Sequence, residues 1–132
     1  MENRYLLFRA FQRQVVELLK KDDIESALLR IFDFLESNQA YIETQIPQSM
    51  AIGISASVSR LKQAFSLGLI EWSLTDLKRS LLVEKCMTLL EYLGREMEKG
   101  IVEKRSYPHI GSFPNLLVVK EALENIENLL SR

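Results

Sequence analysis

The sequence predicts an all-α protein, a compact antiparallel bundle of four to five helices. Apolar residues recur at spacings of three and four in five segments, which is the periodicity of one helical face. No stretch shows the alternation typical of a half-buried strand, and the few glycines and prolines fall where helices should end. The 132 residues fit one domain, and the 47% hydrophobic and 27% charged content is typical of a globular chain.

The first two helices are predicted to form a hairpin. The first covers about residues 3–20, and the second follows after a very short connection. Asp22 or Asp23 can cap the second helix by accepting hydrogen bonds from its first backbone N–H groups. The apolar face of the second helix consists of Ile24, Ala27, Leu28, Ile31 and Leu35. A connection this short leaves only antiparallel packing of the two helices.

The longest helical pattern covers residues 38–67 and contains Pro47. Proline removes a backbone donor and clashes with the preceding turn, so we expect a kink or a restart there. The small residues that follow are Gly53, Ser55, Ala56, Ser57 and Ser59. Small side chains let another helix approach closely, in this chain or in a partner, and packing within the chain is the favoured interpretation.

The turn that follows this helix is unusually apolar for a connection. Gly68 is placed to end the helix in a left-handed conformation, and Leu69 would then fold back on Ala64. Ser73 is a natural N-cap for the next helix, which we expect over about residues 74–98.

The same turn holds the only tryptophan of the chain. Trp72 precedes the expected cap and can pack on Leu77 as a hydrophobic staple. These local roles leave Ile70 unexplained. The turn is therefore either a packed corner between two helices or a surface for a partner, and the sequence leaves both interpretations open.

The last part of the chain is a loop and a final helix. The loop has the sequence "GIVEKRSYPHIGSFPN", and the helix is expected over about residues 115–131. We therefore interpret residues 1–100 as the helical bundle and residues 101–132 as a loop plus a C-terminal helix that packs on the same domain.

No catalytic or metal-binding motif is recognisable, and we expect neither an enzyme nor a cofactor. His109 and Cys86 are the only residues of their kinds, too few for a zinc site of about four N or S ligands. Cys86 lies on an apolar helix face and is expected to be a buried, inert thiol. An enzyme that uses the His109 loop is an alternative with no further support. The acidic residues, Glu91 and Glu96 among them, are interpreted as solvated helix faces and caps.

The charge balance disfavours nucleic-acid binding. The chain has 17 basic and 18 acidic residues and a formal net charge of -1, whereas nucleic-acid binders carry a basic excess or stripe. A single cysteine permits no internal disulfide, which fits a reducing compartment. No run approaches the roughly 20 apolar residues of a membrane span. We therefore expect a cytoplasmic protein that does not enter a membrane.

Two stretches carry a family resemblance, "VVELLKKDDIESALLRIFDFL" and "SASVSRLKQAFSLGLIEWSLTDLKRSLLVEKCMTLLEYL". The first joins two helices through a charged turn and has an "EAL"-like start at Glu25–Leu28. The second has the Leu67–Ile70 corner, a polar cap and then Arg79 near the start of a helix. Over residues 7–95 the chain resembles the eleventh class of bacterial effector-associated domains. It departs from that family at Ser80–Val83, where the family usually carries a further Arg or Asn-Arg run.

The resemblance implies a death-like helical adaptor domain that is not an enzyme. Such domains join proteins in bacterial conflict or defence systems by recognising a like domain, so the partner would carry a like domain or be a second copy. The residues that we select for this contact are Ile70, Trp72, Lys78, Arg79 and Lys85. The alternative, from a different class, is a helical accessory subunit that binds nucleic acid or a nucleotide-handling enzyme.

Overall fold

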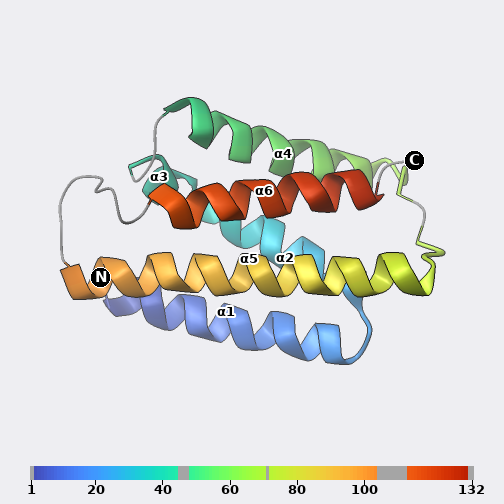
Figure 1. The fold of residues 1–132 in the computed structure, drawn as a ribbon, viewed down its shortest axis with the longest axis horizontal. Helices are drawn as coiled ribbons and strands as arrows, with labels where there is room; N and C mark the ends of the chain where they lie inside the picture. The colour runs from blue at the N-terminus through green and yellow to red at the C-terminus, as the bar shows by residue number, and fades with distance from the viewer. Residues whose placement is uncertain (1, 45–47, 71, 104–112, 131–132) are drawn as a thin grey trace.

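The computed structural model describes residues 2–44, 48–70, 72–103 and 113–130. Within these residues every regular element is a helix, which confirms the predicted fold class (Figure 1). The six helices are α1 (Glu2–Lys20), α2 (Ile24–Ser37), α3 (Gln39–Glu43), α4 (Gln48–Ser66), α5 (Asp76–Glu103) and α6 (Phe113–Leu130).

The number of helices exceeds the expected four to five because the pattern over residues 38–67 is two helices. α3 ends at Glu43, and α4 begins at Gln48, directly after Pro47. Proline disfavours a helical conformation in the residue before it, so a helix pattern usually breaks at that point. The restart is therefore confirmed, and Pro47 itself lies outside the described residues.

The turn between α1 and α2 is closed by a Schellman motif. The N–H of Asp22 donates to the carbonyl of Leu19 at 3.0 Å, and the N–H of Asp23 donates to the carbonyl of Leu18 at 2.9 Å. Asp22 has a φ of 62°, a left-handed conformation that Asp tolerates better than most residues. The Asp23 carboxylate then accepts from the N–H of Ser26 at 3.2 Å, which confirms the predicted cap.

The same motif ends α4. The N–H of Gly68 donates to the carbonyl of Phe65 at 3.2 Å, and the N–H of Leu69 donates to the carbonyl of Ala64 at 3.0 Å. Gly68 has a φ of 67°, where a residue with a Cβ is disfavoured. The predicted glycine cap is confirmed.

The start of α5 differs from the prediction. The helix begins directly after Thr75, whose hydroxyl accepts a hydrogen bond from the N–H of Lys78 at 3.2 Å. Thr75 is therefore the N-cap, and Ser73 lies outside the helix. Leu77 is 69% exposed, too exposed for the predicted hydrophobic staple with Trp72. The linker is two residues longer than expected, and its last residue takes the capping role.

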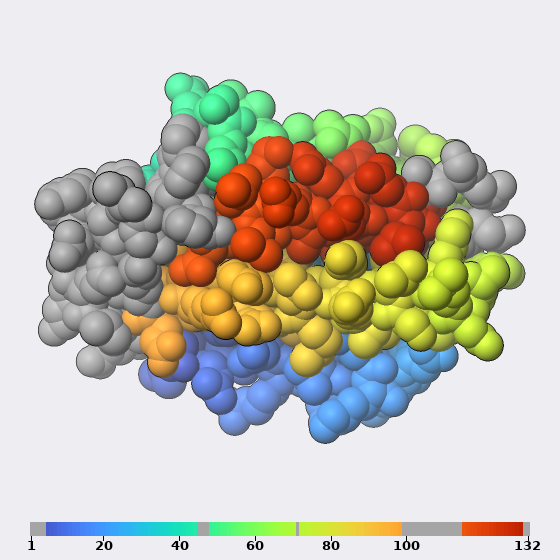
Figure 2. All heavy atoms as spheres, in the orientation of Figure 1, coloured from blue at the N-terminus to red at the C-terminus, as the bar shows by residue number. Residues whose placement is uncertain are grey.

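α6 lies between α4 and α5 and belongs to the hydrophobic core that the other helices share. Figure 2 shows α6 across the middle of one face, with α4 above it and α5 below it. Its buried side chains are Leu116, Val119, Ala122, Leu123, Ile126 and Leu130. α5 and α6 run antiparallel, whereas α4 and α6 run parallel (Figure 1). This parallel contact was not predicted, because helix order along the chain indicates only how successive helices pack.

We expect alanine to have opposite effects at two glycines. Gly53→Ala should raise the free energy of unfolding by about 0.5–1 kcal/mol, because alanine is the better helix former. The new Cβ would lie 2.9 Å from Cε of Lys120, whose flexible side chain can move aside.

Gly68→Ala should lower the free energy of unfolding by about 1–2 kcal/mol because of its positive φ. Urea unfolding measures both, and a destabilised Gly53→Ala variant would show that the α4–α6 contact cannot yield.

Candidate functional site

The structure turns Ile70 inward, so the expectation that it faces a partner is corrected. Ile70 is 9% exposed and belongs to the hydrophobic core. The Schellman motif at Gly68 reverses the chain over the last turn of α4, which points Ile70 toward Leu61 and Leu130. The side chain that the sequence left unexplained therefore holds the linker against the bundle.

Trp72 is half-buried and anchors the linker from the other side. Its ring centroid lies 5.1 Å from that of Phe65, and Phe65 meets Phe32 edge-on at 5.8 Å. Such aromatic pairs contribute about 0.5–1.5 kcal/mol beyond the burial of area. The indole therefore has a structural role within the chain, which leaves only part of its surface for a partner.

The three predicted cations follow in α5 but do not act alike. Nη1 of Arg79 donates to Oδ2 of Asp22 at 3.1 Å and ties α5 to the α1–α2 turn. Lys78 and Lys85 are partly buried and seven residues apart, which places them on one helix face about 10 Å from each other. In the described part of the chain neither lysine has an ion-pair partner. The structure does not bring the five predicted residues into one exposed patch.

The exposed apolar side chains of the corner are leucines instead. Leu67 and Leu69 in the linker are 62% and 63% exposed, and Leu77 in the first turn of α5 is also exposed. The N–H of Leu69 donates to the carbonyl of Ala64, but the Leu69 side chain, which was expected to fold back on Ala64, stays largely in water. In the sequence, only the apolar composition of the linker indicated a contact surface here. That composition does not show which of these side chains face outward.

An apolar hollow of about 260 Å³, the α4–α6 hollow, opens beside Leu69. It lies between the C-terminal halves of α4 and α6, which run side by side toward the same end of the bundle (Figure 1). Its apolar lining consists of Leu61, Ala64, Leu69, Ile70 and Leu130. An exposed leucine at the rim of an apolar hollow is typical of a contact surface, because both lose water-exposed apolar area when a partner binds.

An ion pair forms the polar edge of the α4–α6 hollow. Nε and Nη2 of Arg60 donate to the two carboxylate oxygens of Glu127 at 2.6 and 3.1 Å. The hydrogen bond from Arg60 and then the opposite charge of Glu127 raise the pKa of Arg60, so the guanidinium stays charged. The Arg60 side chain is 58% exposed, so its remaining N–H groups are accessible to a partner.

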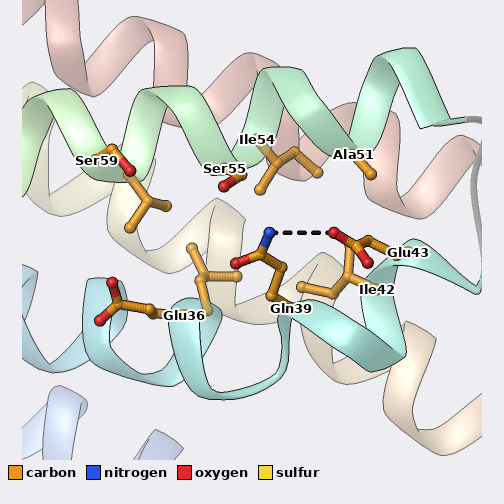
Figure 3. A pocket seen from close by; sticks show the side chains of 10 residues that line it. Glu36, Gln39, Ile42, Glu43, Ala51, Ile54, Ser55 and Ser59 are labelled. Atoms are coloured by element: carbon orange, nitrogen blue, oxygen red, sulfur yellow. Dashed lines mark hydrogen bonds between the residues drawn. The ribbon is translucent and has the colours of Figure 1, made fainter.

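A second hollow lies between α2, α3 and α4. Figure 3 shows Gln39 and Glu43 on its α3 side, joined by a hydrogen bond of 3.1 Å, opposite Ile54 and Ser55 of α4. Its volume is about 40 Å³. Since a buried water needs roughly 10–15 Å³, the hollow has room for a few waters and is too small for a metabolite.

A third hollow is the open groove between α1 and α5, with a volume of about 360 Å³. Phe8 lies in it beside Gly94, where a Cβ would come within 3.0 Å of the Phe8 ring. The two arginines along the groove contact groups on their own helices. Arg9 hydrogen-bonds the Tyr5 hydroxyl at 3.1 Å, and Arg95 pairs with a glutamate one turn away. These two arginines are therefore held by side chains of their own helices and are not joined across the groove.

Cys86 is buried, as predicted, and its environment makes it unreactive. Desolvation raises the pKa of the thiol from 9.0 to about 12, so the nucleophilic thiolate does not form near neutral pH. The described ranges contain no group of three or more His, Cys, Asp or Glu side chains that could hold a metal ion. His109 lies outside those ranges, whereas the two ends of the predicted loop, residues 100–103 and 113–115, belong to α5 and α6.

One acidic residue departs from the expectation of a solvated helix face. Glu96 is 1% exposed and is buried within the bundle. Leu89, Leu93 and Glu96 step by four and three, so this position lies on the apolar stripe of α5, and that spacing was the signal. Glu91 does lie on the surface, as predicted, and it pairs there with Arg95 at 2.7 Å.

Comparison with known proteins finds no relative: no family model, curated protein or solved structure matches the chain. Among the described helices, none has the length and apolar content needed to cross a membrane. The observations that bear on function are therefore the all-helical bundle and the apolar corner with its adjoining hollow.

Substitutions at two neighbouring residues of the corner should distinguish the buried side chain from the exposed one. Ile70→Asp should lower the free energy of unfolding by roughly 3 kcal/mol, because it places a charge in the core. Leu69→Asp should change it by less than about 0.5 kcal/mol, because that side chain already meets water. Urea unfolding followed by circular dichroism measures both, and equal losses would contradict these positions.

The raised pKa of Cys86 predicts a loss of stability above pH 9. In the unfolded chain the thiol ionises at its ordinary pKa of 9.0, while in the folded chain it stays protonated until about pH 12. The folded state then binds more protons, so the free energy of unfolding falls by up to about 1.4 kcal/mol per pH unit above pH 9. Urea unfolding between pH 8 and pH 11 should show a shallower decline for Cys86→Ala, and identical slopes would contradict the burial.

Proposed function

We propose that this chain is a non-enzymatic protein–protein interaction adaptor of the helical-bundle type. It recognises a like domain on a partner protein or on a second copy of itself. Its resemblance to the bacterial effector-associated domains supports recruitment in a cytoplasmic conflict or defence system. The partner contact lies at the α4–α5 corner.

The observation that carries this proposal is the exposure of Leu67 and Leu69 beside the apolar α4–α6 hollow. In the same linker Ile70 is buried and Trp72 is half-buried, whereas Leu67 and Leu69 stay in water. Burying a leucine side chain is favourable by about 1.5–3 kcal/mol. A partner that covers both leucines and fills the hollow therefore gains a substantial part of a specific binding energy.

The pairing of basic side chains favours an adaptor over the alternative of a nucleic-acid-binding accessory subunit. Five described cations form ion pairs with acids of the same chain: Arg60, Lys62, Arg79, Arg95 and Lys120. Binding to phosphates requires cations that can replace condensed counterions, and a cation held by a carboxylate is less available for this. Salt-dependent binding of the purified chain to DNA or RNA would reverse this preference.

Affinity capture in the cells that produce the chain tests the proposed function. The tagged chain should enrich a partner protein, and Leu69→Glu should reduce that enrichment at least about tenfold, equivalent to about 1.4 kcal/mol. Leu7→Glu is the matched control, since Leu7 is 67% exposed on α1, away from the corner. Equal loss in both variants, or enrichment of neither a partner protein nor an untagged copy of the chain, would contradict a recruiting role for the corner.

A further inference from the structure

The α4–α6 hollow and the exposed Leu69 at its edge lie on the same surface of the chain. Leu69 projects from the rim and is largely exposed, while the hollow beside it is lined by Leu61, Ala64 and Ile70. The surface thus carries an apolar projection and an apolar recess next to each other. A two-fold contact between identical chains requires this combination, because each copy must supply both parts.

The charges at the rim are also self-complementary. The rim carries one cation and one anion, Arg60 and Glu127, held together by two hydrogen bonds. A strongly acidic or basic partner would meet one attractive and one repulsive charge there. A second copy rotated by 180° would place each Arg60 opposite the Glu127 of the other chain, and the exposed guanidinium has N–H groups left for that contact.

From these two observations we infer that the α4–α6 hollow binds a second copy of this chain through a two-fold symmetric contact. Leu69 of each copy enters the hollow of the other, and the two Arg60–Glu127 pairs join into a ring of four alternating charges. This inference rests on the proposed function, because it names the partner of the same corner.

Sedimentation velocity over a wide concentration range is the first test. The wild-type chain should form a dimer, and Leu69→Glu should raise the dimer dissociation constant at least tenfold. Leu7→Glu, which changes an equally exposed leucine on α1, should leave the dissociation constant unchanged. Unfolding curves for both variants show whether the monomers remain folded.

Exchange of the rim charges tests the symmetry of the contact. Arg60→Glu leaves two carboxylates on each rim, and Glu127→Arg leaves two guanidinium groups, so each variant alone should dimerise at least tenfold more weakly. An equimolar mixture of the two should recover the wild-type affinity, because each like-charged rim then meets its opposite. A contact between two different surfaces of the chain would show no such recovery.

Three results would overturn the inference. The first is a wild-type chain that stays monomeric up to about 1 mM, which corresponds to about 4 kcal/mol of binding. The others are a dimer that Leu69→Glu leaves intact and charge variants whose affinity does not recover on mixing. A monomer that captures an unlike protein through Leu69 would overturn the two-fold contact but leave the proposed adaptor function in place. A dimer that captures no other protein would support the contact and exclude recruitment of an unlike partner.

Discussion

The packing of α6 is the constraint on which the rest of the bundle depends. In the described residues α4 and α5 do not pack on each other, so they are held together by α6 on one side and by α2 on the other. α6 contributes buried side chains along its whole length, among them Leu116, Leu123 and Ile126. The α4–α6 hollow and the ion pair of Arg60 with Glu127 belong to the same contact. The candidate surface therefore exists only when α6 is in place.

Local signals in the sequence predicted the features that local physics decides. The left-handed glycine at Gly68 and the cap at Asp23 depend only on residues within one helical turn, and both were identified correctly. The break at Pro47 has the same origin, since proline acts on its own backbone and on the residue before it. The N-cap of α5 was misplaced because Ser73 and Thr75 are both competent caps, and the helix uses the second.

Features that depend on distant parts of the chain could not be predicted in this way. The burial of Ile70 depends on Leu130, sixty residues later, which lines the same hollow and which no local pattern around Ile70 could reveal. The parallel contact of α4 with α6 is likewise invisible to helix periodicity, which gives the buried face of each helix but not its neighbour. Glu96 differs, because its place on the apolar stripe of α5 could be seen in the sequence. It was nevertheless assigned to the surface because it is charged, and the structure buries it.

The late position of α6 in the chain has a consequence for how the protein is made. Synthesis proceeds from the N-terminus, so α1 to α5 are complete while the helix that joins α4 to α5 is still absent. At roughly 5–20 residues per second, the ribosome needs about 1 to 5 s to extend the chain from the end of α5 to the end of α6. Until α6 has left the ribosome and docked, the apolar faces of α4 and α5 that it covers are not shielded by the chain itself. Uncovered apolar faces of this kind are the surfaces through which incomplete chains aggregate and which chaperones bind.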